Sequence, residues 1–224
     1  MVVIGVLGDI HGDFDSVRRI MRQLPDVHVW LCVGDLPDEQ GTYHAVDAPL
    51  FFIKGNNENF DTIASAALPE NLHFIPNAIR VEIGGVVVVG LGGTFAPTWY
   101  ETAATDLPHP KKGSARATEL ADKRRHFVRE EVEACKAMRD VDIFLTHEAA
   151  KPFRPIPGGR GPDAGKAQIN EVLASMKPRL HLFGHHHRYT EQEREGVPSI
   201  GLDLISRSFI TIDTDTLAVA LLRS

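Results

Sequence analysis

The apolar and polar positions at the start of the chain predict a strand, a loop and a helix. Residues 1–7 form an apolar run with several β-branched side chains, and it ends at Gly8-Asp9, as a buried strand that leads into a polar loop does. From Asp13 to Leu24, apolar side chains recur at the spacing of one helix face, and Pro25 follows. This spacing predicts a helix that ends before the proline.

The same order of strand and polar loop then recurs twice. Apolar runs at 27–33 and 50–53 end at Gly34-Asp35 and Gly55-Asn56. Strands that alternate with helical patterns are typical of parallel sheets, in which the carboxyl ends of neighbouring strands meet at one edge. We therefore expect three parallel strands whose loops point the same way.

After Asn71 the pattern changes to short apolar runs at 72–75, 78–83 and 86–91, with Gly84-Gly85 as a two-residue hairpin turn. These runs predict a second part of the fold in which antiparallel pairing dominates. Residues 95–116 are rich in Pro, Thr, Ala and Gly and show no period. We expect this stretch to form an irregular excursion or cap over one end of the sheet.

The rest of the chain returns to longer elements. Its pattern predicts a long helix with an apolar face from Leu120 to Cys135, a strand at 141–145, a helix at 164–176, a strand at 179–183 and two or three closing strands between 199 and 222. The sequence shows no internal repeat, and its length suits a single domain over residues 1–224.

Composition and charge narrow the class of protein. With 43% hydrophobic and 24% charged residues, the 224-residue chain resembles a globular protein with a real core. Its formal charge of −6 disfavours extensive binding to duplex nucleic acid, which needs a basic surface. No apolar run is long enough to span a bilayer, the first residues lack a leader pattern, and two cysteines are too few for a disulfide framework. We therefore expect a cytoplasmic protein that does not enter a membrane.

Five of the predicted strands end in short polar motifs. They are Gly8-Asp9-Ile10-His11-Gly12, Gly34-Asp35, Gly55-Asn56-Asn57-Glu58, Thr146-His147 and Gly184-His185-His186-His187. A packed core needs none of these groups, whereas carboxylate, imidazole and amide oxygen are ligands for divalent first-row metals. The motifs therefore predict a pair of metal ions, with Mn favoured and Fe, Zn, Co or Ni as alternatives.

In identity, order and spacing, these motifs resemble those of the calcineurin-like metallophosphoesterases, whose signature runs D-x-H, GD, GN-H-[DE], H and GHxH. The resemblance extends over residues 8–187. It implies an α/β fold, a four-layer αββα sandwich of two mixed β-sheets flanked by helices. It also implies a hydrolase that cleaves phosphoric esters with a binuclear metal centre.

The resemblance assigns three ligands to each ion and one to both: Asp9, His11 and His187 to one, Asn56, His147 and His185 to the other, and Asp35 as the bridge. It further implies that a hydroxide bridging the ions attacks the phosphorus in line with the leaving oxygen. Asp35, Asn56 and Asn57 would then be the catalytic residues.

At Asn57 the sequence departs from the family pattern, because many members carry a histidine there that helps to protonate the leaving group. Asparagine can donate an amide N–H to a phosphate oxygen, but it is not a general acid. Branches without the histidine are often described as phosphodiesterases. We therefore expect hydrolysis of phosphodiesters, with Asn57 in contact with substrate and with His44, His109 or His186 as the alternative acid.

Three other side chains are candidates for supporting roles. Arg154 and Arg160 follow His147 in a loop, and guanidinium groups can bind phosphate oxygens in a bidentate way. Glu58 can orient Asn57 or His147 by hydrogen bonding, or it can be an acidic residue at a helix N-terminus.

Three other functions stay open at this point. One is a phosphomonoesterase acting on a nucleotide, a sugar phosphate or a phosphoprotein. Another is a catalytically weak, metal-binding scaffold for protein interactions, although scaffolds of this fold tend to lose ligands and all seven positions are filled here. The third is a nuclease, against which the acidic balance counts. We expect a small phosphoester or nucleotide substrate, and the sequence leaves a homo-oligomer open.

Overall fold

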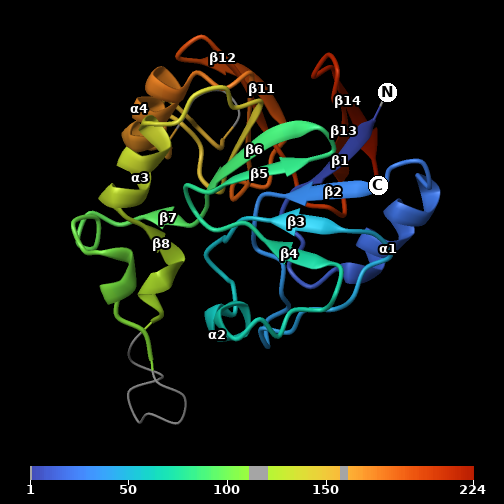
Figure 1. The fold of residues 1–224 in the computed structure, drawn as a ribbon, viewed down its shortest axis with the longest axis horizontal. Helices are drawn as coiled ribbons and strands as arrows, with labels where there is room; N and C mark the ends of the chain where they lie inside the picture. The colour runs from blue at the N-terminus through green and yellow to red at the C-terminus, as the bar shows by residue number, and fades with distance from the viewer. Residues whose placement is uncertain (1, 111–120, 157–160) are drawn as a thin grey trace.

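The computed structural model describes residues 2–110, 121–156 and 161–224. Within these ranges the strands form two six-stranded sheets and one small two-stranded sheet (Figure 1). The first sheet has the order β14 (Val219–Arg223), β13 (Ser208–Asp213), β1 (Val3–Leu7), β2 (Val29–Cys32), β3 (Leu50–Phe52) and β4 (Leu72–Phe74). The second has the order β11 (Thr190–Arg194), β12 (Val197–Gly201), β10 (Leu180–Phe183), β9 (Ile143–Thr146), β6 (Val86–Leu91) and β5 (Arg80–Ile83).

Apolar cores between the sheets and on their outer faces hold the layers together. The central core lies between the sheets, where Ile4 and Leu31 of the first sheet share one cluster with Leu145 and Leu182 of the second. Helix α1 (Phe14–Gln23) covers the outer face of the first sheet, and α3 (Arg129–Lys136) and α4 (Ala167–Met176) cover the outer face of the second. These helices lie on opposite sides of the molecule in Figure 1. The expected αββα sandwich of two mixed sheets is therefore confirmed.

Strand direction places the candidate motifs. Strands β1, β2 and β3 pair in parallel in the first sheet, as do β6, β9 and β10 in the second. The predicted parallel order of the first three strands is confirmed. Because parallel strands deliver their carboxyl ends to the same edge, the polar motifs that follow β1, β2, β3, β9 and β10 gather at one end of the sandwich.

The region after Asn71 differs from the prediction. Strand β4 pairs in parallel with β3, so the expected antiparallel character is wrong for this strand. The reason is a crossover through the short helix α2 (Phe60–Ala64), whose first turn is capped by the Asn59 side chain. The β5–β6 hairpin, with its turn at Gly84-Gly85, is antiparallel as predicted.

The long helix expected up to Cys135 is also wrong over its first half. Leu120 lies outside the described residues, and the 3-10 turn η2 (Lys123–Arg125) and strand β8 (His126–Phe127) precede α3. Strand β8 pairs with β7 (Thr94–Phe95), and Phe127 packs against Phe95 with ring centroids 6.0 Å apart. Tertiary pairing therefore extends a segment whose apolar spacing also fits a helix.

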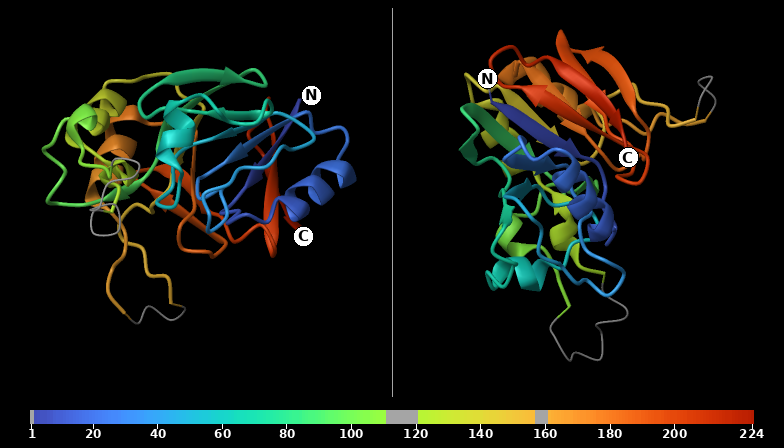
Figure 2. Two further views of the ribbon diagram at one scale, coloured as in Figure 1. Left: turned by 90° about the horizontal axis from the view of Figure 1, so that it is seen from below. Right: turned by 90° about the vertical axis from the view of Figure 1, so that its right-hand side faces the viewer.

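The remaining expectations are met in part. The described part of the excursion, 95–110, contains only the end of β7 and the 3-10 turn η1 (Ala104–Asp106), while residues 111–116 lie outside the described residues. Strand β11 was not expected, because its side chains are nearly all polar. Both chain ends lie on the side away from α3 and α4 (Figure 2). No helix in the described ranges is long and apolar enough to cross a membrane.

Candidate metal centre

The first group of candidate ligands joins the loop after β1 to the loop after β10. Nε2 of His187 lies 3.0 Å from Oδ2 of Asp9 and 3.2 Å from Nε2 of His11. Nε2 of His11 lies 3.9 Å from the same Asp9 oxygen. One ligand atom of each residue therefore faces a space small enough for a single ion to contact all three.

The second group of candidate ligands lies beside the first. Nε2 of His147 lies 3.0 Å from Oδ1 of Asn56 and 3.2 Å from Nδ1 of His185. Oδ2 of Asp35 lies 3.6 Å from Nε2 of His147 and 3.8 Å from Nε2 of His11. A single Asp35 oxygen therefore faces both groups, as a bridging ligand requires.

Hydrogen bonds outside the two groups fix the ligand orientations. The Nδ1–H of His147 donates to the carbonyl oxygen of Val33 over 2.8 Å, which leaves the lone pair of Nε2 directed at Asn56 and Asp35. The backbone N–H of His185 donates to both carboxylate oxygens of Asp9, each at 3.1 Å. These contacts prepare neutral imidazole and ionised carboxylate, the forms that bind metals.

The pKa shifts of Asp9 and His185 agree with that assignment, whereas the shift of His187 favours its protonated form. Burial alone raises the pKa of Asp9, but hydrogen bonds from His187 and from the backbone of His185 bring it below its usual value. Burial, together with the charge of His147, lowers the pKa of His185 to about 4. The hydrogen bond to Asp9 raises the pKa of His187. Near neutral pH, Asp9 is therefore ionised and His185 is neutral.

Four of the seven candidate ligand residues have a left-handed backbone. The φ angles are 46° at His11, 55° at Asp35, 66° at His185 and 48° at His187. This conformation costs about 1 kcal/mol or more for a residue with a Cβ. Such strain is concentrated at functional sites, where it directs side chains that a relaxed turn would point elsewhere.

Close backbone packing explains two of the glycines in the motifs. A Cβ on Gly184 would lie 2.4 Å from Oδ1 of Asp9, and a Cβ on Gly55 would lie 2.0 Å from Oδ1 of Asp35. Both distances are far shorter than a real van der Waals contact. Only glycine therefore lets the loops after β3 and β10 approach the two carboxylates.

Asn57 contacts the candidate bridge. Its backbone N–H donates to Oδ1 of Asp35, and its side-chain Nδ2 donates to Oδ2 of Asp35, both at 2.8 Å. The rest of the Asn57 residue is exposed. Asn57 therefore holds the Asp35 carboxylate, while its position at the surface keeps it within reach of a ligand that enters the centre.

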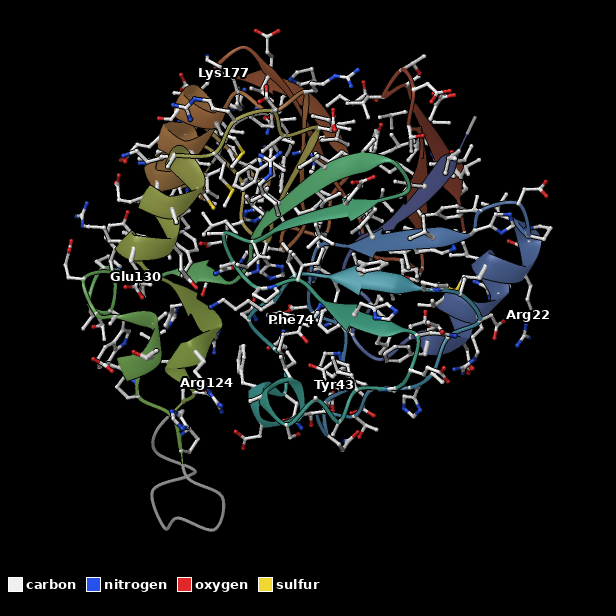
Figure 3. All side chains as sticks on the ribbon, viewed as in Figure 1. Arg22, Tyr43, Phe74, Arg124, Glu130 and Lys177 are labelled. Carbon is white, nitrogen blue, oxygen red and sulfur yellow. The ribbon has the colours of Figure 1, made fainter. Side chains whose placement is uncertain are left out.

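Glu58 directly precedes Asn59, the N-cap of α2, and its carboxylate also bonds to neighbouring loops. Its Oε1 accepts hydrogen bonds from the backbone N–H groups of Gly55 at 3.1 Å and Leu36 at 3.4 Å, and its Oε2 accepts from the Tyr43 hydroxyl at 2.6 Å. The described hydrogen bonds thus link Glu58 to neither Asn57 nor His147. Burial raises its pKa to about 7. Glu58 thereby connects the loops that carry Asp35 and Asn56. Tyr43, which the motifs did not indicate, donates to Glu58 and accepts from the backbone N–H of Asn59 at the start of α2 (Figure 3).

Of the two candidate phosphate contacts, Arg154 lies within the described residues. Arg154 is exposed and donates to the carbonyl oxygen of Gly161 over 2.9 Å, and Arg160 lies outside the described residues. The motifs missed Arg207, which is exposed, pairs with Asp203 at 3.1 Å and donates to the carbonyl oxygen of His187 over 3.4 Å. Nothing in the local sequence around Arg207 indicates this position, because the closing strands bring it there.

The three alternative acids differ in their surroundings. The His186 ring stacks on Phe153 with centroids 4.4 Å apart, and burial lowers the pKa of His186 to about 3. His44 lies with its Nε2 3.8 Å from Oδ2 of Asp38, and His109 contacts the Leu107 carbonyl. Among the described residues, the one candidate ligand that any of these three rings contacts is His185, the chain neighbour of His186.

The donor set fits a pair of first-row divalent ions. It combines two buried carboxylates, four imidazoles and one amide oxygen around a shared Asp35, which suits Mn, Fe, Co, Ni or Zn better than an all-oxygen ion such as Ca²⁺. The described structure places no lysine or arginine ion pair on Asp9 or Asp35. Two divalent ions would compensate the charge of both carboxylates.

Several solved structures share the fold. A Thermus thermophilus protein is 15% identical, with a TM-score of 0.66 over 99% of this chain and 98% of that one. A dimetal phosphatase from Danio rerio is 14% identical, with a TM-score of 0.58 over 94% and 91% of the two chains. GAP50, the anchor in the inner membrane complex of Plasmodium, is 11% identical, with a TM-score of 0.53 over 99% and 88%. No curated protein sequence matches the chain.

The sequence itself gives the stronger comparison. Residues 2–189 match the sequence profile of the calcineurin-like phosphoesterases. This range contains all five polar motifs that gather at the edge of the sandwich, and the match supports phosphoester hydrolysis as the reaction. From this match, the chain belongs to the calcineurin-like phosphoesterase family.

Proposed function

We propose that this protein is a phosphodiesterase that works with two divalent metal ions, preferably Mn²⁺. Asp9, His11 and His187 would hold one ion, Asn56, His147 and His185 the other, and Asp35 both. The observation that supports this proposal most strongly is the position of Asp35, whose Oδ2 lies within 4 Å of a histidine from each group.

The ions would supply the chemical activation, and the chain would orient the groups around them. When bound, two divalent ions acidify a water molecule, hold phosphate oxygens and stabilise the charge of the transition state. The chain contributes orientation: Val33 fixes the ring of His147, the backbone of His185 fixes Asp9, and Asn57 fixes Asp35. With only two carboxylates in the ligand set, the loaded centre keeps a net positive charge that attracts phosphate.

The preference for diesters rests on Asn57. An asparagine cannot protonate a leaving group, and the branches of the family that lack the histidine of this motif are often phosphodiesterases. A role for Arg154 or Arg160 at the nonbridging phosphate oxygens is part of the proposal. The proposal also includes a cytoplasmic setting. The buried Cys32 and Cys135 form no disulfide, which agrees with a reducing compartment.

Initial rates on bis-p-nitrophenyl phosphate and p-nitrophenyl phosphate test the proposal. The protein is assayed after chelation, after Mn²⁺ is added back, and as the Asp35→Asn variant. Restored hydrolysis of the diester, well above that of the monoester and absent in the variant, supports the proposal. A preference for the monoester would make the protein a phosphomonoesterase, and two bound ions without turnover of either ester would favour a scaffold.

A further inference from the structure

A cavity of about 830 Å³ opens beside the candidate metal centre. One wall contains His11 of the first ligand group and Asn57, which holds Asp35. The loop after β2 also lines the cavity, with the residues Pro37, Asp38, Glu39, Gln40 and Gly41. Pockets for small ligands have volumes of roughly 300–1,000 Å³, so the cavity has room for an organic group attached to a phosphate at the centre.

The loop that forms this wall is held in place by its own hydrogen bonds. Oδ1 of Asp38 accepts from the backbone N–H groups of Gln40 at 3.0 Å and Thr42 at 2.8 Å. The side chain of Asn59, at the start of α2, donates to the carbonyl oxygen of Gly41 over 3.1 Å. The cavity is therefore bounded by a tied loop and is present before a ligand enters.

The charge of the lining is of one sign. Its acidic residues are Asp38 and Glu39 of the loop and the buried Glu58, which accepts from Tyr43, and it contains neither lysine nor arginine. The turn N–H groups lower the pKa of Asp38, and among the described residues the one ion-pair partner of its Oδ2 is the His44 ring, with Nε2 3.8 Å away. Glu39 is exposed, and the described residues give its carboxylate no hydrogen bond or ion pair. An anionic group in this cavity would meet two carboxylates, whereas a cation would have two partners.

Basic side chains lie near His187, another ligand of the same group as His11. Arg207 contacts the backbone of His187, and Arg188 donates to the backbone of Pro155. The acidic loop lines the cavity together with His11 and Asn57, whereas neither of these two arginines is among the lining residues of the cavity.

We propose that this cavity receives one ester group of the substrate and selects a cationic or uncharged, hydrogen-bond-donating group over an anionic one. This inference rests on the proposed function, because the phosphate must sit at the metal centre for its ester group to reach the cavity. It names the substrate class as phosphodiesters with an amine-bearing or hydroxylated group, and it disfavours esters that carry a second phosphate or a carboxylate.

Three p-nitrophenyl phosphodiesters test the selection, with choline, ethyl or 2-carboxyethyl as the second ester group. The kcat/KM of the Mn²⁺-loaded protein should fall in that order, with about tenfold between the choline and the carboxyethyl ester at low ionic strength, as one or two exposed charges near contact distance give. The ratio should shrink in about 0.5 M NaCl, since salt screens exposed charges.

Charge reversal at Glu39 tests whether the loop after β2 causes the preference between the esters. Glu39→Lys should reverse the order of the choline and carboxyethyl esters, and Glu39→Gln should reduce their ratio. Glu70→Lys is the matched control, because Glu70 is an exposed acid beside the start of β4, at the end of the sheet away from the centre. It should keep the wild-type ratio.

Calorimetry separates this inference from the proposed function. Phosphocholine, ethyl phosphate and phosphoglycolate are titrated into the Mn²⁺-loaded protein, so that charge preference is measured without turnover. Tighter binding of phosphocholine than of phosphoglycolate, lost in Glu39→Lys, supports the inference even if no ester is hydrolysed. Equal affinities, or a preference that Glu39→Lys leaves unchanged, overturn it even if the diesters are hydrolysed.

Discussion

The buried His181 should make the stability of the fold depend on pH. Its ring is fully buried in β10 between Phe144 and Phe183, with centroids 5.6 and 5.5 Å away. Nε2 lies 2.9 Å from the hydroxyl of Thr146, and Nδ1 lies 3.1 Å from the hydroxyl of Ser199. The Thr146 hydroxyl also donates to the Glu148 carbonyl. These partners suit a neutral ring, in which Nε2–H donates to Thr146 and Nδ1 accepts from Ser199.

The direction and size of the effect follow from this burial. Desolvation lowers the pKa of His181 from 6.5 to about 3, so between these values the unfolded chain binds a proton that the folded chain does not. The contribution of His181 to stability is therefore complete above pH 6.5 and is lost as the pH falls toward 3. At about 1.4 kcal/mol per pH unit, the fold should lose about 2 kcal/mol between about pH 7.5 and pH 5 through this residue.

Urea unfolding of the metal-free protein in EDTA, at several pH values from about 5 to 7.5, measures this loss. His181→Leu removes the titrating ring and leaves Thr146 and Ser199 with the Glu148 and Val197 carbonyls as acceptors. The free energy of unfolding should fall less steeply with pH in this variant, by about 2 kcal/mol over the range. His28→Leu, at an exposed position, is the control and should keep the wild-type slope. Equal slopes for wild type and His181→Leu would refute the reasoning.

Other predictions concern the candidate centre. Gly184→Ala should lower Mn²⁺ affinity at least about tenfold, because the added Cβ would lie 2.4 Å from Oδ1 of Asp9; calorimetric titration of a variant that still unfolds cooperatively checks this, and unchanged affinity would contradict it. Rates on a series of aryl phosphodiesters should fall as the leaving-group pKa rises, because Asn57 is not an acid; a flat series would mean that another group supplies the proton. Asn57→His should make that dependence less steep, and an unchanged slope would show that the position does not reach the leaving oxygen. Replacing Glu58 by Leu should reduce kcat more than it changes KM, since it releases the loops that carry Asp35 and Asn56; a pure change in KM would contradict this positioning role.

The sequence predicts the layers of the fold because its apolar runs and helical spacing are regular. The runs before Asp9, Asp35 and His147 are dominated by apolar residues, and each forms a strand at the expected place. The segment before Cys135 was harder to predict, since the apolar residues Phe127 and Val128 fit a helix face as well as a strand. Pairing of β8 with β7 decided between the two. Strand β11 gave no signal because pairing with β12, and not an apolar face, forms it.

The residues of the candidate centre could be predicted from the sequence, but the hydrogen bonds that orient them could not. Strand ends with Asp, Asn or His indicate the seven candidate ligands, since parallel strands bring their loops together. The orientation of His147 depends on the Val33 carbonyl, a backbone group with no sequence signal. Tyr43 contacts Glu58 from a loop, and Arg207 contacts the backbone of His187 from the turn before β13; no motif marks either position. The hydrogen bonds from Asn57 to Asp35 likewise depend on the turn after β3.

Electron paramagnetic resonance of the Mn²⁺-titrated protein tests the central proposal, a binuclear centre bridged by Asp35, most directly. The account predicts that two Mn²⁺ ions bind per chain and give the spectrum of an exchange-coupled pair, because one oxygen of Asp35 faces both ligand groups. It also predicts that Asp35→Asn loses the coupled spectrum. A single bound ion, or two ions without coupling in the wild-type protein, would contradict the proposal.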